Sequence, residues 1–229
     1  GAYTNPMVLR IAGLGYQKGF GGHFHNDNSV AVLRDIPGVI LAVPSNGADA
    51  ARMLRECVRL AREESRVVVF LEPIALYPMR DLHGDKDGLW MTRYPDPSES
   101  IALGEVGVRG EGTDLAIVTF GNGVYLSNQA LPEIEAAGIK ARIVDTRWLS
   151  PLPKAALTAA VAGCRNILIV DETRHSGGVA EALMAHFHEA APGVPLARLT
   201  AEDSFIATGP AYAVTMPSSQ GIAAAAKGL

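Results

Sequence analysis

Two short apolar runs most constrain the fold of this chain. VILAV (residues 39–43) and RVVVFLE (residues 66–72) are nearly continuous in aliphatic and aromatic residues, as is typical of strands buried on both faces of a parallel sheet. A segment of helical periodicity separates them; Ser45 or Asn46 can cap its start, and it continues to about Glu64. The chain is therefore expected to be an α/β protein built from βαβ units.

An irregular stretch divides the chain into two such series. Residues 77–97 contain three prolines, mixed charges and no clear period, which is typical of a linker or of a loop that lies over a partner. We therefore expect two α/β units, residues 1–80 and 113–229, joined by a linker at residues 81–112. The further strands are expected at residues 6–11, 115–120, 139–145, 166–172 and 194–200, and the further helices at residues 28–35, 125–137, 153–162, 178–190 and 218–227.

The composition argues against several classes of protein. Hydrophobic residues make up 48% of the chain, which is enough for one large core or two modest ones. The twenty lysine and arginine residues are scattered and the net charge is −4, so no nucleic-acid partner is expected. Glu72 and Pro73 interrupt the apolar stretch RVVVFLEPIALYP, so no membrane-spanning segment is expected. Cys57 and Cys164 lie outside any C-x-x-C pattern, which favours two buried free thiols in a cytoplasmic protein.

The stretch GGHFHNDNS (residues 21–29) holds three residues of metal-ligand type. On an extended segment His23, His25 and Asp27 share one face, where two imidazoles and a carboxylate could converge on a metal ion. Metallo-β-lactamase-type hydrolases open their metal site with H-x-H-x-D-H, but Asn28 stands here in place of the last histidine. Three ligands without a fourth make a weak site, so a loop with local hydrogen bonds is favoured and a metallohydrolase is the remote alternative.

Two glycine-containing turns follow expected strands. Gly121 and Gly123 open a helix as in a dinucleotide-binding turn, and Asp145 ends the next strand, where a ribose-binding acid would stand. The third glycine of that motif would fall on Leu126, so an ordinary tight turn is favoured. Residues 171–178 also join a strand to a helix. They could leave the helix N-terminus open to an anion, or form a crowded turn that needs glycine, and the sequence leaves both open.

Several segments, taken in order, resemble one known family. The segments are PMVLRI with the glycine-rich loop after it, HNDNSVAVLRDIPGVILAVPSNGADAARML, VVVFLEPIALY, IVDTRWLSPLP, the turn at residues 172–178, and AEDSFIATGPA with the tail MPSSQGIAAAAKGL. Together they cover essentially all of the chain. They resemble the β subunit, or β half, of the thiamine-diphosphate-dependent E1 component of 2-oxo acid dehydrogenase complexes, which is related to transketolase.

The resemblance implies a site residue. Counting back from Pro37-Gly38 places His25 on the family's active-site histidine, which stabilises charged intermediates or shuttles protons near the reacting carbon. Asn26, Asp27 and Asn28 stand where the family has S-Q-S, so contacts to the substrate or the acyl acceptor are expected to differ. The first histidine of the stretch has no counterpart in the family, which favours thiamine chemistry over a metal.

The resemblance also implies what the chain lacks. Residues 1–80 correspond to the rear half of the family's pyrimidine-binding domain, and residues 113–229 to a complete transketolase C-terminal-like α/β domain with a mostly parallel sheet. The family's activating glutamate, and the G-D-G…N signature that binds the diphosphate and magnesium, have no match here. Thiamine diphosphate and Mg²⁺ are therefore expected in the complete enzyme, and this chain is expected to be inactive alone.

A monovalent cation is a further expectation from the resemblance. The family often holds such an ion on backbone carbonyls after the helix that precedes V-V-F-L-E. Here the carbonyls would be those of Leu60, Ala61, Glu63 and Ser65, and the ion would be K⁺. An ordinary helix C-terminus explains the same residues equally well.

The implied function is the oxidative decarboxylation of a 2-oxo acid with transfer of the acyl group to a lipoyl arm. The implied partners are the remaining E1 domains or an α subunit, and the lipoyl acyltransferase (E2), within a homo- or hetero-oligomer. The alternatives are a non-catalytic assembly module and a transketolase-type transferase. The motif R-W-L-S-P-L-P favours the dehydrogenase branch, and nothing in the sequence indicates which 2-oxo acid is the substrate.

Overall fold

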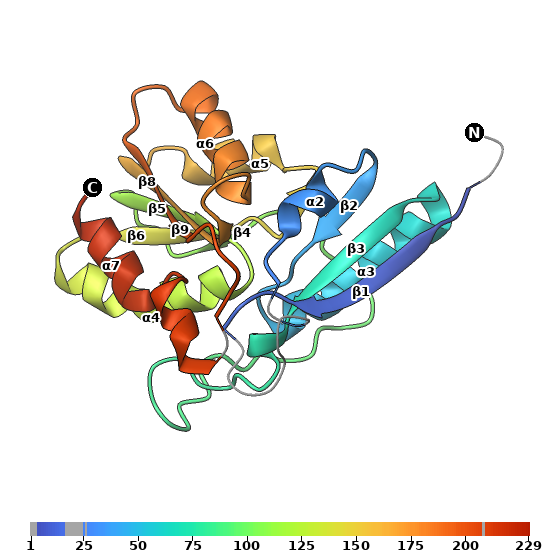
Figure 1. The fold of residues 1–229 in the computed structure, drawn as a ribbon, viewed down its shortest axis with the longest axis horizontal. Coiled ribbons are helices and arrows are strands. Elements are labelled where there is room, and N and C mark those ends of the chain that lie inside the picture. Colours follow the sequence, from blue (N-terminus) through green and yellow to red (C-terminus); the bar gives the residue numbers. More distant parts are fainter. Residues whose placement is uncertain (1–3, 17–24, 26, 208) are drawn as a thin grey trace.

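Two sheets organise the chain, and Figure 1 shows them side by side with helices against their faces. The structure is a computed structural model and describes residues 4–16, 25, 27–207 and 209–229. Both sheets are mostly parallel, which confirms the expected α/β class.

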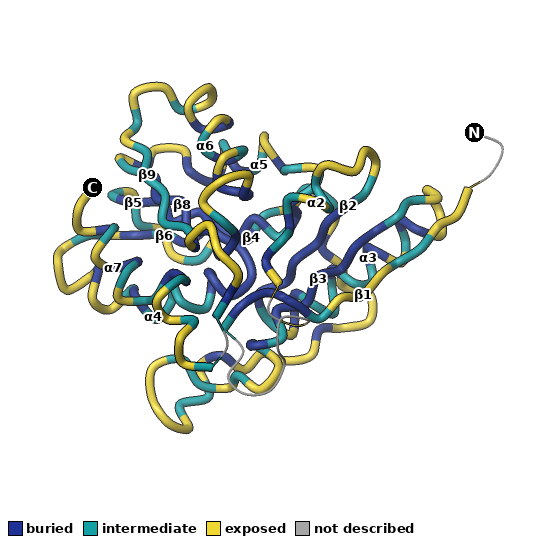
Figure 2. Tube along the Cα trace, in the orientation of Figure 1, coloured by how far each residue is buried: buried dark blue, intermediate teal, exposed yellow. Residues whose placement is uncertain are grey.

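The first sheet has the strand order β1-β3-β2-β7. Its elements are β1 (Met7–Gly13), α2 (Val30–Arg34), β2 (Val39–Ala42), α3 (Gly47–Glu64), β3 (Val67–Pro73), the 3₁₀ helix η1 (Ile74–Leu76), and β7 (Trp148–Ser150). The side chain of Asn46 accepts the backbone N–H of Asp49 at 3.0 Å and caps α3, as the sequence predicted. Strand β1 lies at the edge of this sheet, and its middle residues are exposed (Figure 2).

The second sheet has the order β4-β6-β5-β8-β9. Its elements are β4 (Gly107–Arg109), β5 (Leu115–Thr119), α4 (Asn122–Ala136), β6 (Ala141–Asp145), α5 (Lys154–Val161), β8 (Asn166–Arg174), α6 (Val179–Ala190), β9 (Leu196–Ala201), the 3₁₀ helix η2 (Gly209–Val214), and α7 (Ser219–Lys227). Helices α4 and α7 pack together on one face, and α5 and α6 cover the other (Figure 1). None of the helices in the described ranges is long and apolar enough to cross a membrane.

Two strands depart from the pattern expected from the sequence. Strand β4 lies inside residues 81–112, which the sequence predicted to be a linker, and it pairs antiparallel with β6 of the second sheet. Strand β7 follows β6 along the chain but pairs antiparallel with β2 of the first sheet. Each has only three residues, which is too short for a hydrophobic period to appear in the sequence.

The apolar core is continuous between the two sheets. One buried cluster contains Leu41 and Val69 of the first sheet together with Val118 and Ile169 of the second. Figure 2 shows the inner strands of both sheets in dark blue. Cys57 and Cys164 are buried free thiols, as the sequence predicted. The two units therefore share a buried interface, and they are not independent domains joined by a flexible linker.

Trp148 carries β7 into the core of the first sheet. Its side chain is fully buried and packs in one cluster with Ile40, Met53 and Phe70. A residue from the second half of the chain thus fills space between β2, β3 and α3.

Replacing Trp148 by alanine is expected to destabilise the protein by about 3–5 kcal/mol, because the substitution leaves a large cavity in a packed core. Urea unfolding followed by circular dichroism measures this loss. Tyr94→Ala is the matched control, since Tyr94 is 73% exposed and its ring lies under the Arg55 guanidinium, so its loss should cost under about 1 kcal/mol. Equal costs for the two variants would contradict this account of the core.

Candidate functional site

The carboxyl ends of the parallel strands of the two sheets meet at one junction. The Ser45 hydroxyl, just after β2, donates to a carboxylate oxygen of Asp145 at the end of β6, at 2.5 Å. Gly121, just after β5, faces the first sheet so closely that a Cβ there would lie 3.3 Å from Val43 and 3.4 Å from Pro73. Ligands of open α/β sheets bind outside the carboxyl ends of the strands. The junction is therefore the first place to look for a functional site.

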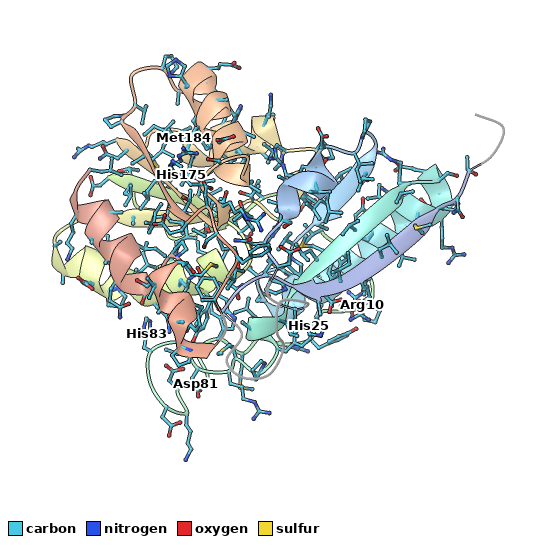
Figure 3. All side chains as sticks on the ribbon, viewed as in Figure 1. Arg10, His25, Asp81, His83, His175 and Met184 are labelled. Atoms are coloured by element: carbon cyan, nitrogen blue, oxygen red, sulfur yellow. The ribbon has the colours of Figure 1, made fainter. Side chains whose placement is uncertain are left out.

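Leu14 and residues 27–29 lie at this junction. The Leu14 N–H donates to the Asp27 carbonyl at 3.2 Å, which ties the start of the glycine-rich loop to its end. The Asp27 carboxylate accepts the backbone N–H of Ser29 at 2.9 Å and its hydroxyl at 2.6 Å. His25 is exposed, and Figure 3 shows it between the two sheets in this view. Two residues of the predicted site, His23 and Asn26, lie outside the described residues.

The C-terminal end of β8 holds residues 27–29 in place. The buried Asn28 donates from its side-chain amide to the Glu172 carbonyl at 3.1 Å. Arg174 donates to the Ser29 hydroxyl at 3.0 Å, and its guanidinium lies 3.9 Å from the Asp27 carboxylate. The second sheet thus fixes residues 27–29, and no local pattern in the sequence signals these contacts.

The turn at residues 171–178 is the crowded kind. A Cβ on Gly178 would lie 2.3 Å from the Arg174 carbonyl oxygen, so glycine is required there. The first N–H groups of α6 are already occupied, because Val179 donates to the Thr173 hydroxyl and Ala180 to the Asp171 carboxylate at 2.6 Å. The anion at this helix N-terminus is therefore a side chain of the protein itself.

The turn at Gly121 is also occupied by the protein's own carboxylate. The N–H of Asn122 donates to one oxygen of Glu172 at 3.0 Å, and its side-chain amide donates to the other at 2.7 Å. Gly121 has a φ of 53°, and a Cβ there would lie 2.9 Å from the Glu172 carboxylate. These contacts agree with the tight turn that the sequence favoured. Asp145 is buried against Ser45, away from any ribose-binding arrangement.

Glu172 is a strongly perturbed acid of the junction. Burial raises the pKa of Glu172 to about 8, although hydrogen bonds from Asn122 act in the opposite direction and the nearby Asp171 adds to the rise. Burial also raises the pKa of Asp171 itself. A protonated Glu172 needs an acceptor for its proton. The Asn122 side-chain oxygen is buried without a partner among the described residues, and a half-turn of that amide would let it accept the proton.

A cavity of about 530 Å³ opens beside the end of β3. Its lining is mainly apolar and includes Leu54 and Phe70. Its main polar feature is Glu72, whose carboxylate accepts two bonds from Arg10, at 2.5 and 3.1 Å, and one from the Tyr77 hydroxyl. Burial acts to raise the pKa of Glu72, but the hydrogen bonds from Arg10 and Tyr77 outweigh it and hold that pKa below its usual range. Glu72 therefore stays ionised and paired.

The expected cation carbonyls lie at an ordinary helix end. Ser65 has a φ of 54°, and its N–H caps α3 by donating to the Leu60 carbonyl. The Arg66 N–H donates to the same carbonyl at 3.2 Å, so both lone pairs of that oxygen are engaged. Only the carbonyls of Ala61, Glu63 and Ser65 then remain for an ion. Within the described part of the chain there is also no group of three or more His, Cys, Asp or Glu side chains suited to a metal.

Replacing Glu172 by glutamine is expected to flatten the dependence of stability on pH. In the unfolded chain this carboxyl loses its proton near its ordinary pKa of 4.5, whereas in the folded protein it keeps the proton up to about 8. Between these values the folded state binds more protons, so the free energy of unfolding of the natural protein falls as pH rises. Urea unfolding at pH 5, 6, 7 and 8 measures both slopes.

Glu135→Gln is the matched control for this pH experiment, because Glu135 is exposed on α4. The free energy of unfolding of this variant should depend on pH as that of the natural protein does, since the buried acids are the same in both. A Glu172→Gln profile parallel to the natural one would show that Glu172 titrates in the folded protein as it does in the unfolded chain.

Comparison with known proteins agrees with this architecture. The β subunit of the pyruvate dehydrogenase E1 component of Bacillus subtilis (strain 168) is 29% identical over 226 residues, which are 95% of this chain and 63% of the relative. The same subunit of Staphylococcus aureus (strain Mu50 / ATCC 700699) is 27% identical over 235 residues, which are 99% of this chain and 66% of the relative. The chain thus spans just under two thirds of the length of these relatives.

A solved structure shares the fold. It is described as "Split gene transketolase, inactive beta4 tetramer", and it superimposes with a TM-score of 0.63 and 20% identity over 96% of this chain and 64% of that chain. The family model of the transketolase C-terminal domain matches residues 104–222. This match begins just before β4 and ends within α7, so it includes the whole second sheet. The expected kinship is confirmed, and the chain belongs to the family of the transketolase C-terminal domain.

Proposed function

We propose that this chain is part of the β-type subunit of a thiamine-diphosphate-dependent 2-oxo acid dehydrogenase E1. The observation that carries the proposal is the docking of residues 27–29 on the C-terminal end of β8. Hydrogen bonds from Asn28 and Arg174 hold the stretch that follows His25 at the junction of the two sheets. His25 is exposed next to residues 27–29, at the carboxyl ends of the strands of both sheets. An imidazole in this position is suited to meet a substrate that is held by the α subunit or by the remaining E1 domains.

The residues of this chain fit part of the cofactor. The apolar cavity beside β3, with Phe70 in its wall, is large enough for a flat aromatic ring. The described residues include no cluster of acidic ligands for a divalent ion. The resemblance assigns Mg²⁺ and the diphosphate of thiamine diphosphate to the remaining E1 domains or the α subunit. When bound, thiamine diphosphate supplies the electron sink for loss of carbon dioxide from a 2-oxo acid.

His25 would move a proton near the reacting carbon. Its imidazole suits this role because the ordinary pKa of histidine lies close to neutral pH. Residues 27–29 would set the direction from which the substrate approaches His25. The sequence Asn26-Asp27-Asn28, in place of the family's S-Q-S, would alter contacts to the substrate or the lipoyl acceptor. The curated relatives described above are named for pyruvate, so pyruvate is the first substrate to test.

The proposed partners follow from the same kinship. The chain would pair with an α subunit or with the remaining E1 domains, and the assembled enzyme would pass its acyl group to a lipoyl acyltransferase. A K⁺ ion near Ala61 and Glu63 belongs to this proposal, although one of its four expected carbonyls is already engaged by the helix cap. The similar solved structure is described as an inactive β4 tetramer, which supports a homo-oligomer as one form of this chain.

One observation favours assembly as a function in its own right. Phe205 and Val214, in the segment before α7, are 78% and 83% exposed. Large apolar side chains on a surface are common at contacts between proteins. A non-catalytic assembly module is therefore the second candidate, and it differs from the first in predicting that no added chain restores turnover.

His25→Ala is expected to lower turnover of pyruvate about 10²–10⁴-fold in the enzyme reconstituted with its complementary chain, because a positioned proton-transfer group contributes about this much. Release of carbon dioxide and reduction of a lipoyl acceptor measure turnover. This chain alone is expected to give only background rates.

His83→Ala is the matched control for the turnover experiment. His83 is exposed in the irregular stretch between the units, so its loss should leave turnover unchanged. Equal turnover of both variants would reject the role of His25, and turnover by the natural chain alone would reject the need for a complement.

A further inference from the structure

A second cavity lies on the other side of the start of α3. Its volume is about 400 Å³, which is within the range of small-molecule sites. Asn46 and Thr92 line both this cavity and the apolar one beside β3, so the two are neighbours with a shared wall. The character of the second cavity is different, because charged side chains dominate its lining. These are Arg52, Arg93, Arg109, Arg147, Asp49 and Asp145.

The two aspartates are already engaged by the protein. Asp49 is buried and accepts two bonds from the Arg147 guanidinium, at 3.1 and 2.8 Å. Asp145 is buried and accepts the Ser45 hydroxyl and the Arg147 backbone N–H. A third carboxylate, Glu99, takes the Arg52 side chain at 3.0 Å. The carboxylates near the cavity thus bind protein groups that line or surround it.

Two of the four arginines remain without an opposite charge. Neither Arg93 nor Arg109 forms an ion pair with any part of the chain that the structure describes. The Arg109 guanidinium lies over the Trp90 ring, 5.1 Å from its centre, and this stacking restrains its position. The start of α3 adds a partial positive charge on the same side. The cavity therefore carries an excess of positive charge.

The floor of the cavity is rigid. Arg147 has a φ of 58°, an unusual backbone conformation for a non-glycine residue, and its guanidinium packs on Gly107. A Cβ at Gly107 would lie 2.9 Å from that guanidinium, so glycine allows this close contact. The carboxylate of Asp49 then fixes the guanidinium from the other side. An incoming anion would meet positioned groups and would not have to order them.

We propose that this cavity binds a compact, multiply charged oxyanion of the phosphate class, such as the diphosphate group of a small molecule. Arg93 and Arg109 would bind it directly, because guanidinium groups match phosphate oxygens with paired hydrogen bonds. Arg52 and Arg147 would contribute positive potential while they remain bound to their carboxylates. The site does not depend on the proposed E1 function, since that function uses none of its four arginines.

Titration calorimetry of the full chain with inorganic pyrophosphate, at constant ionic strength, tests the proposal. Saturable binding is expected for the natural protein, and Arg93→Gln and Arg109→Gln are each expected to weaken it about tenfold, the effect of losing one charge-assisted hydrogen bond. Arg62→Gln is the matched control, because Arg62 is exposed at the far end of α3 and lies outside the cavity. Urea unfolding of each variant confirms that the fold is retained.

The outcomes separate the alternatives. No saturable binding to the natural protein, or equal affinities for Arg93→Gln, Arg109→Gln and Arg62→Gln, would overturn the proposal. ADP serves as a second probe. Affinity equal to that of pyrophosphate would show that the diphosphate group alone is recognised, and tighter binding lost in the same two variants would identify a nucleotide site.

Discussion

Strand β7 leaves the second half of the chain and pairs antiparallel with β2 of the first sheet, and the rest of the structure depends on this pairing. It brings Trp148 into the first core, where the side chain is fully buried. It also sets Arg147 beside Asp49, so that an ion pair of 2.8 Å joins the two units at the start of α3. A pair in such a place is costly to break, because either charge alone would be left largely desolvated.

The carboxyl edges of the two sheets face each other because of this connection. Parallel strands present their carboxyl ends on one side of a sheet, and the two sheets meet at those ends in a junction lined by turns. Polar side chains fill it. Asn28 reaches the second sheet, and Asn122 reaches Glu172, so each turn is held by a group from elsewhere in the chain. Helix N-termini at the junction are occupied by internal carboxylates, whereas His25 is exposed.

The same structural elements support the junction and the arginine-lined cavity. Helix α3 starts between them, and its cap residue Asn46 lines the cavity on each side. The ion pair between Asp49 and Arg147 serves both, because it fixes the units and forms the cavity floor. Loss of this ion pair by substitution would therefore affect both the junction and the arginine-lined cavity. Such shared support is typical where binding groups are placed on rigid elements.

The sequence by itself determined the class of fold and most of its elements. The runs at residues 39–43 and 66–72 became buried strands, and Asn46 capped α3, because hydrophobic period and capping are local properties of the chain. The resemblance of whole segments also identified the family. His25 as a site residue comes from that resemblance and stays a prediction.

Tertiary structure alone decided the rest. Strands of three residues such as β4 and β7 carry no readable period, and only their partners make them strands. Asn28 and Glu172 are 144 residues apart, so no local pattern could pair them. The turn at residues 171–178 was open to two interpretations until the position of the Asp171 carboxylate settled it. The raised pKa of Glu172 arises from burial, and burial depends on segments that only folding brings together.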